Sequence, residues 1–208
     1  MRRNLVAPLV AVALAAAVAS CGGGGAAPRP QALHGLVPVE PMRVGGYSLP
    51  EVTASPARDF AFRAPEGGFL AVFFGFTHCP DICPTTMADL SRALELLGPS
   101  RSGHVTVAMV TIDPERDDAA VLDGFLRRFF PVGRYVGLRT DDEATLARVQ
   151  RAFGVPSQRT VRPDGSVDFG HGSVVAVVDE HGDVRVLWPF GVSSRDMTED
   201  LRALLADG

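Results

Sequence analysis

Lysine is absent from the 208-residue chain, and all twenty of its basic residues are arginine. The formal net charge is −4, and it becomes −4 − 2 = −6 once Arg2 and Arg3 at the N-terminus are set aside. An acidic chain without a basic cluster lacks the positive patch with which proteins neutralise nucleic-acid phosphates. The composition therefore argues against a nucleic-acid partner, and the absence of lysine is read as codon bias rather than mechanism.

Cysteine is scarce, and the chain has only Cys21, Cys79 and Cys83. Cys79 and Cys83 lie in the stretch FFGFTHCPDICPTTM, residues 73–87, and no second pair is present to complete a four-cysteine zinc site. Three residues separate the two cysteines, one more than in the Cys-x-x-Cys motif of redox dithiols. The pair therefore predicts either soft metal ligands or a redox-active disulfide.

A long uninterrupted apolar run is also missing from the N-terminal segment. In MRRNLVAPLVAVALAAAVASC, two arginines precede an apolar stretch that Pro8 interrupts and that is short for a stable membrane span. This layout predicts a signal peptide over residues 1–20. The ending VASC resembles a bacterial lipobox, so Cys21 is predicted to be lipidated. The alternative is an ordinary signal peptide in which Cys21 is incidental.

Residues 21–44 are rich in Gly, Pro and Ala and show neither helical nor strand periodicity. This composition predicts a flexible membrane-tether linker ahead of a folded domain at residues 45–208. The predicted location is the cell membrane, with a lipid anchor and with the domain facing the extracytoplasmic side, where a disulfide can form. His34 in the linker is predicted to be a solvated loop residue.

The folded domain shows strand and helix patterns in alternation. The apolar run at 69–76 predicts a strand buried on both faces, a helix follows it to Gly98, and another strand is predicted at 104–112. The remaining expected elements are helices at 117–130 and 140–154, strands at 173–179 and 183–190, and a last helix capped by Ser193. Thr140 and Glu143 are expected to form a capping box at the start of the 140–154 helix.

This order contains a βαβ unit followed by two strands in a hairpin and a helix. It predicts an α/β chain with a thioredoxin-like fold, in which helices flank a central mixed β-sheet. The two cysteines fall where the first strand meets its helix. A thiol at a helix N-terminus faces unpaired N–H groups and the positive end of the helix dipole, so this position is expected to favour the thiolate.

Two thiolates at this spacing select soft ions such as Cu(I), and one added imidazole would also allow Cu(II). The chain has five histidines that could supply it: His34, His78, His104, His171 and His181. His171 is favoured because it immediately precedes a strand, in the loop that packs beside the dithiol in thioredoxin-like proteins and usually carries a cis-proline there. A purely structural role for His171 is the alternative. His78 is adjacent to Cys79, and a neighbour in an extended segment usually points the opposite way.

Three stretches in the same order, FFGFTHCPDICPTTM, VTIDPERD and GHGSVVAVVDEHG, resemble the Sco/SenC family of membrane-anchored copper chaperones. The resemblance covers roughly residues 45–191. It implies that Cys79, Cys83 and His171 bind one copper ion, as Cu(I) or Cu(II). One departure is Gly170, which stands where the family often has aspartate, and it is expected to loosen the orientation of the imidazole.

The resemblance also implies a partner. The family matures the dinuclear copper centre of cytochrome c oxidase subunit II, by delivering copper, by reducing that centre's cysteines, or by both. Other periplasmic copper carriers are further expected partners. The sequence therefore predicts a copper carrier rather than an enzyme.

Three alternatives remain at the level of sequence. A thiol–disulfide oxidoreductase would cycle Cys79 and Cys83 without metal, although the extra residue between them and the missing cis-proline disfavour it. A peroxidase of related fold needs a Thr-x-x-Cys setting, whereas Thr77 lies only two positions before Cys79. A copper or redox sensor acting on another membrane protein is the third alternative.

Overall fold

The computed structural model describes residues 32–161, 167–171 and 173–206. The predicted signal peptide and Cys21 lie outside the described residues. In the described part, a mixed sheet of seven strands has the order β2-β1-β5-β4-β3-β8-β9, and β6 and β7 form a separate two-stranded sheet. The strands are β1 (Ser48–Glu51), β2 (Arg58–Ala61), β3 (Phe69–Gly75), β4 (Val105–Thr111), β5 (Tyr135–Leu138), β6 (Ser157–Val161), β7 (Val167–His171), β8 (Val174–Val178) and β9 (Val184–Pro189).

Parallel strands β3, β4 and β5 form the centre of the sheet, and antiparallel β8 and β9 extend it beyond β3. The apolar run of β3 is buried along its whole length, because neighbouring strands and the helices on both faces cover it. The helices are α1 (Ile82–Leu97), α2 (Pro99–Ser102), α3 (Ala119–Leu126), α4 (Glu143–Ala152) and α5 (Ser194–Leu204).

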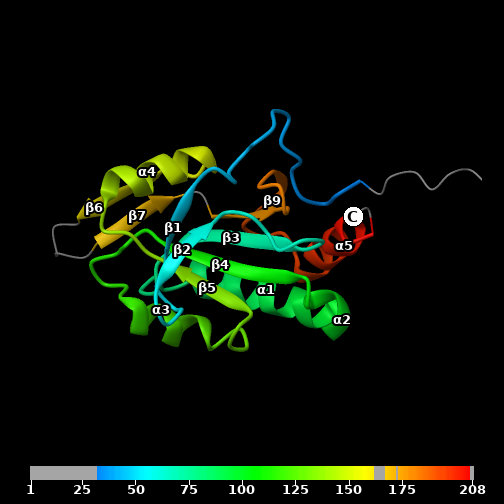
Figure 1. Cartoon of the computed structure of the whole chain (residues 1–208), viewed down its shortest axis with the longest axis horizontal. Coiled ribbons are helices and arrows are strands. Elements are labelled where there is room, and N and C mark those ends of the chain that lie inside the picture. The colour runs from blue at the N-terminus through cyan, green and yellow to red at the C-terminus, as the bar shows by residue number, and fades with distance from the viewer. Residues whose placement is uncertain (1–31, 162–166, 172, 207–208) are drawn as a thin grey trace, which may run out of the picture. The chain divides into compact units, whose positions relative to one another are not determined.

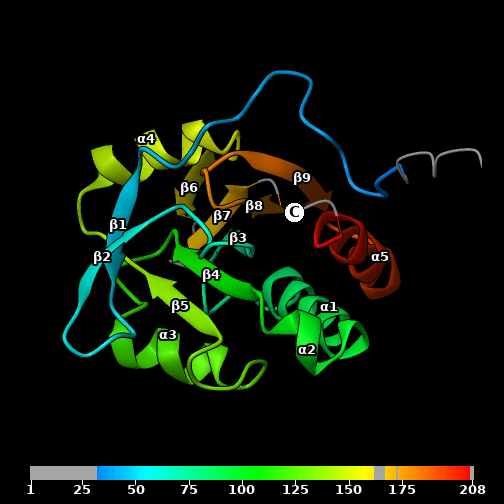
Figure 2. The ribbon, with the colours of Figure 1, turned by 45° about the vertical axis from the view of Figure 1, so that its right-hand side comes forward.

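Helices cover both faces of the sheet (Figures 1 and 2). The connections β3-α1-β4 and β4-α3-β5 run in the same direction along the sheet, so right-handed crossovers place α1 and α3 on one face, where α5 packs against α1. On the other face, α4 is followed by Phe153, whose ring lies 5.2 Å from that of Phe74 on β3. The predicted thioredoxin-like arrangement, with a central mixed sheet flanked by helices, is confirmed.

The additions to the predicted order are strands β1, β2, β5, β6 and β7 and the short helix α2. β5 carries only four residues, YVGL, and is too short to show a period. The β1–β2 hairpin forms the far edge of the sheet beyond β5, through Glu51 paired with Leu138. The turn before α4 also differs, because the helix is capped by Asp142, whose carboxylate accepts from the Ala144 N–H, and the expected capping box of Thr140 is wrong. The expected cap of α5 is confirmed, since Ser193 accepts from the Asp196 N–H.

The segment from Ala32 to Val44 belongs to the same compact unit as the rest of the domain, although the sequence assigned it to a linker. Leu36 forms an antiparallel bridge with Leu187 on β9, and Val44 is fully buried with its N–H bonded to Gly182. Asp200 on α5 accepts hydrogen bonds from the backbone of this segment and from the Trp188 indole. From Ala32 onward the described chain therefore packs against the domain. These contacts depend on β9 and α5, which lie more than 130 residues further along the chain.

Among the described residues, no helix is both long enough and apolar enough to cross a membrane.

Candidate metal and redox site

The sheet topology brings three loops to one edge. Because β3 and β4 are parallel, with Gly75 opposite Thr111, the loops that follow them leave the sheet side by side. Strand β8 runs antiparallel to β3, with Val175 opposite Phe73, so β8 begins at that same edge. The loop carrying the two cysteines, the loop of the DPERD motif and the start of β8 therefore meet at the carboxyl end of the parallel strands, where ligand sites of α/β sheets are commonly found.

Cys79 and Cys83 sit on either side of the start of α1. Cys83 is the second residue of the helix and is fully buried, whereas Cys79 lies in the preceding loop and is half-buried. The Cys83 N–H points at Cys79 Sγ, 3.4 Å away, so the Cys79 sulfur occupies the position of a helix-capping acceptor. Both cysteines are free thiols. The structure thus brings together the pair that the sequence predicted, with Cys79 half-buried and Cys83 fully buried.

Gly75 at the end of β3 leaves the space that the Cys83 sulfur fills. A Cβ atom built at Gly75 would lie 3.0 Å from Cys83 Sγ and 2.4 Å from the Phe73 ring. Such contacts are shorter than carbon and sulfur tolerate in a packed core. A side chain at this position would therefore displace the Cys83 thiol or the Phe73 ring. The absence of a side chain at Gly75 is thus needed for the observed position of Cys83.

The protonation state of Cys83 differs from the sequence expectation. Burial raises the pKa of the Cys83 thiol far above its ordinary value, and the neighbouring Cys79 and Asp117 raise it further. Desolvation therefore outweighs the favourable helix N-terminus at this residue. Without a bound ion Cys83 is a neutral thiol, so the binding of a metal cation must release its proton.

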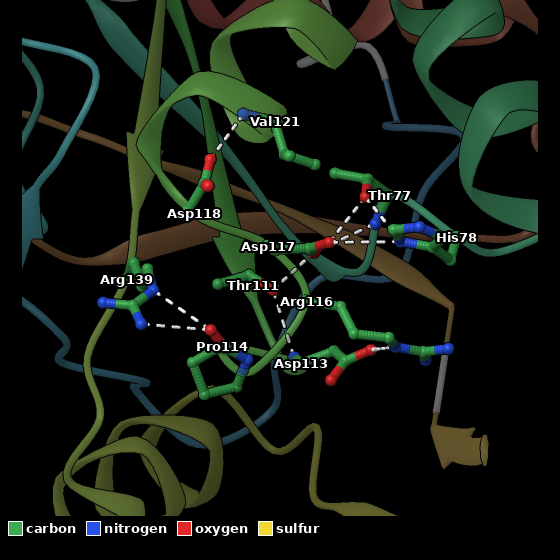
Figure 3. Close-up of polar contacts among 10 residues, drawn as sticks. All are labelled: Thr77, His78, Thr111, Asp113, Pro114, Arg116, Asp117, Asp118, Val121 and Arg139. Atoms are coloured by element: carbon green, nitrogen blue, oxygen red, sulfur yellow. Dashed lines mark hydrogen bonds and ion pairs between the residues drawn. The ribbon is translucent and has the colours of Figure 1, made fainter.

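Asp117 joins the loop after β4 to the cysteine loop (Figure 3). Its fully buried carboxylate accepts from the Thr77 N–H at 3.0 Å, from the Thr77 hydroxyl at 2.5 Å and from the Thr111 hydroxyl at 2.7 Å. The His78 Nδ1 atom lies 3.6 Å from the same carboxylate. Thr77 is two residues before Cys79, so Asp117 positions the segment of chain that carries the half-buried Cys79. Sequence reasoning did not single out Asp117, although it ends the DPERD motif.

The remainder of the DPERD loop is held by its own contacts. The buried Asp113 carboxylate pairs with Arg116, and the backbone N–H of Asp113 donates to the Thr111 hydroxyl. Arg139 donates from two nitrogens to the Pro114 carbonyl, at 3.0 and 3.2 Å (Figure 3). The turn at Asp113 and Pro114 is thus held by Thr111 at the end of β4 and by Arg139, which follows β5.

His171 is the last residue of β7, where its backbone pairs with Ser157, and β8 begins three residues later. The chain at His171 therefore approaches the edge of the sheet at which Cys79 and Cys83 lie. Its side chain is outside the described part of the structure. Among the side chains that are described, no group of three or more His, Cys, Asp or Glu is arranged to hold a metal ion. The three-ligand set predicted from the resemblance therefore stays a prediction.

The other candidate histidines are distributed as the topology dictates. His104 precedes β4 and His181 lies in the turn between β8 and β9, both at the edge of the sheet opposite the cysteines. His34 is not a free loop residue, because its Nε2 atom lies 3.0 Å from Glu199 Oε2 on α5. Among the histidines whose side chains are described, His78 is the one in the cysteine loop, and its side chain is 54% exposed.

The profile of the SCO1/SenC family matches residues 51–206. An SCO2-like protein of Rickettsia conorii is 31% identical over 139 residues, which is 66% of each chain. The chain spans 60% and 66% of the length of two of the curated relatives it matches.

Two solved structures resemble the chain over most of its length. The apo Sco1 protein of Thermus thermophilus has a TM-score of 0.69 and 31% identity, and the match covers 83% of this chain and 97% of that one. ScoI of Bradyrhizobium japonicum, solved with copper bound, has a TM-score of 0.63 and 25% identity, and the match covers 78% of this chain and 96% of that one. Both matches agree with the fold described above.

Proposed function

Because the chain belongs to the SCO1/SenC family, we propose that it is a lipid-anchored, extracytoplasmic copper chaperone. One copper ion is its cargo, bound through Cys79, Cys83 and His171. The recipient is the dinuclear copper centre of cytochrome c oxidase subunit II, with other periplasmic copper carriers as further partners. The relative from Bradyrhizobium japonicum was solved with copper bound, which supports the choice of metal.

The observation that carries this proposal is the pair of free cysteines at the start of α1. Two thiols close together, one half-buried and one enclosed, suit a soft ion of low coordination number such as Cu(I). Zinc would require four ligands, and the described part of the site offers no acidic or histidine cluster to complete them. The imidazole of His171 would add the nitrogen that allows Cu(II) to be held as well.

A second candidate function, thiol–disulfide exchange, is favoured by the unequal exposure of the two sulfurs. The accessible Cys79 thiolate would attack a disulfide of the partner and form a mixed disulfide, releasing one partner thiolate. The enclosed Cys83, after losing its proton, would then attack Cys79 Sγ. That step leaves a Cys79–Cys83 disulfide and releases the second partner thiolate. This division of labour serves reduction of the recipient's cysteines before copper delivery. A copper or redox sensor would use the same two states of the cysteine pair, the reduced dithiol and the disulfide.

Metal analysis of protein purified from the cell separates chaperone from oxidoreductase. A chaperone is expected to carry copper near one equivalent and to bind Cu(I) when its thiols are reduced. The oxidised protein should bind none until it is reduced, because a disulfide has no thiolates to offer. Equal Cu(I) uptake by the reduced and oxidised proteins would remove the cysteines from the site.

Replacing His171 with alanine tests the third ligand. Cu(II) prefers nitrogen ligands, and thiolates alone tend to reduce it, whereas Cu(I) is satisfied by two thiolates. His171→Ala is therefore expected to lose the sulfur-to-copper charge-transfer band of the Cu(II) form while Cu(I) affinity falls by only about tenfold. Titration with each ion, followed by absorbance and by chelator competition, measures both effects.

Histidines at the opposite edge of the sheet provide the controls for this experiment. His104→Ala and His181→Ala should bind both ions like the parent. Retention of the Cu(II) band in His171→Ala, together with its loss in His78→Ala, would place the third ligand in the cysteine loop and contradict the proposed set.

The lipid anchor is tested at Cys21. Cys21→Ser is expected to abolish incorporation of labelled lipid and to release the protein from the membrane fraction, because acyl chains on that cysteine would supply the membrane affinity. Fractionation of cells fed with labelled palmitate measures both. An unlabelled parent, with a Cys21→Ser variant that still sediments with membranes, would exclude lipidation at this residue.

A further inference from the structure

His78 lies in the loop that carries Cys79, and Thr77 and Asp117 lie close to one nitrogen of its ring. His78 immediately precedes Cys79, and its Nδ1 atom lies 3.1 Å from Thr77 Oγ1 and 3.6 Å from Asp117 Oδ1 (Figure 3). The side chain is nevertheless 54% exposed. One ring nitrogen is therefore engaged with the protein while a large part of the ring faces solvent.

The hydrogen atoms of this cluster can be assigned. A carboxylate only accepts hydrogen bonds, so the Thr77 hydroxyl donates its single hydrogen to Asp117 Oδ1, 2.5 Å away. The Thr77 oxygen can then only accept from His78, which requires the hydrogen of the neutral ring to be on Nδ1. The lone pair of the ring is consequently on Nε2, for which no hydrogen bond to a described residue is found. Histidines that bind metals are commonly prepared in this way, with one N–H bonded to a carboxylate or another acceptor.

We propose that His78 Nε2 is a transfer ligand for copper, which contacts the ion together with Cys79 while the ion enters or leaves the site. Thr77 and Asp117 are the positioning residues that keep its lone pair available. This inference rests on the proposed function. It follows from the order of exposure, because an ion arriving from a partner reaches the half-buried Cys79 and the exposed His78 before it reaches the buried Cys83.

The exchange involves ligands only and no change of oxidation state. A Cu(I) ion leaves its donor for His78 Nε2 and for Cys79 Sγ, whose thiol proton passes to solvent. Cys83 then releases its proton to solvent, and its sulfur displaces Nε2 from the ion. Departure reverses these steps. A ligand that holds the ion only during exchange lowers the barrier equally in both directions, so it changes rates and leaves the equilibrium affinity untouched.

The test uses the reduced full-length protein in detergent and the chelator bicinchoninate as both donor and acceptor of Cu(I). Stopped-flow absorbance gives the rates of loading and removal, and equilibrium competition gives the affinity. His78→Ala is expected to slow both rates by about tenfold while the affinity stays within about twofold of the parent, the size of effect typical for one auxiliary metal contact. His181→Ala, an exposed histidine at the opposite edge, is the matched control and should match the parent.

The positioning residues are tested with Thr77→Val and Thr77→Ser. Valine removes the hydroxyl and should slow exchange by about threefold or more, whereas serine keeps it and should restore the parent rates. Thr77→Val also removes one hydrogen-bond donor to the buried Asp117, which can impair folding. If this variant folds poorly, the test depends on Thr77→Ser and on the NMR spectrum of the parent. Long-range ¹H–¹⁵N NMR of the neutral His78 ring should show the proton on Nδ1.

Unchanged exchange rates in His78→Ala would overturn the inference, and so would a proton found on Nε2 in the parent. A loss of affinity that matches the loss of loading rate would make His78 a resident ligand, which also overturns it. If the parent itself takes up no Cu(I), the proposed copper function fails and the inference fails with it. Tight Cu(I) binding with unaltered exchange in His78→Ala would instead sink the inference alone.

Discussion

Cys83→Ser is expected to lower the Cu(I) affinity by about two to three orders of magnitude. This loss corresponds to about 3–4 kcal/mol, the share of one ligand in the binding free energy of a four-ligand structural zinc site. The reason is chemical, because a serine hydroxyl neither ionises near neutral pH nor binds soft ions well. The described side chains contain no group of three or more His, Cys, Asp or Glu that could hold the ion in its place. Chelator competition on the reduced protein measures the change.

Cys79→Ser is the matched variant for this experiment. Both substitutions remove one sulfur, so the two losses of Cu(I) affinity should be similar. Their effects on folding should differ, because Cys83 is fully buried and Cys79 is half-buried. An unpaired hydroxyl in the interior costs about 1–3 kcal/mol, so only Cys83→Ser should lower the free energy of unfolding measurably. If Cys83→Ser bound Cu(I) as tightly as the parent while remaining folded, Cys83 would not be a ligand.

Asp117→Ala is expected to lower the free energy of unfolding by about 2–4 kcal/mol. The fully buried carboxylate accepts two hydrogen bonds from Thr77 in the cysteine loop and one from Thr111 at the end of β4. Its removal leaves the Thr77 N–H without an acceptor in the interior and opens a cavity beside Thr111. The same change should weaken copper binding, because the loop that Asp117 holds carries Cys79. Urea denaturation and Cu(I) competition measure the two effects.

Asp118 provides the control, since it is the neighbouring aspartate and also makes a backbone contact. Its exposed carboxylate caps α3 by accepting from the Val121 N–H at 2.9 Å (Figure 3). Asp118→Ala should therefore cost only about 1 kcal/mol, the typical value of a helix N-cap, and should leave copper binding as in the parent. Equal losses of stability in the two variants, with equal copper affinity, would mean that the buried network does not position the site.

The central elements of the fold are determined by local sequence patterns. The apolar run of β3, the helical spacing after Cys83 and the Ser193 cap each depend on residues a few positions apart, and all three are found where the sequence predicted them. The place of Cys79 and Cys83 at a strand–helix junction follows from the same patterns. Side-chain size and backbone hydrogen bonding act over these short distances, so the sequence suffices to predict them.

Other features of the site required the tertiary structure. Asp117 accepts a hydrogen bond from Thr77, which lies 40 residues earlier in the chain, and no local sequence pattern at either residue predicts this contact. The short strand β5 is stabilised by hydrogen bonds to β4, and the bridge at Leu36 is stabilised by hydrogen bonds to β9. Neither segment has a local sequence pattern that predicts this pairing. The neutral state of Cys83 is a further case. The helix N-terminus, which the sequence shows, favours the thiolate, but the surrounding core, which only the fold assembles, raises the pKa of that thiol. The sequence by itself determined which residues could bind a soft metal, and the packing of distant segments decided which of them are exposed, enclosed or held in place, because burial and long-range contacts are properties of the folded chain.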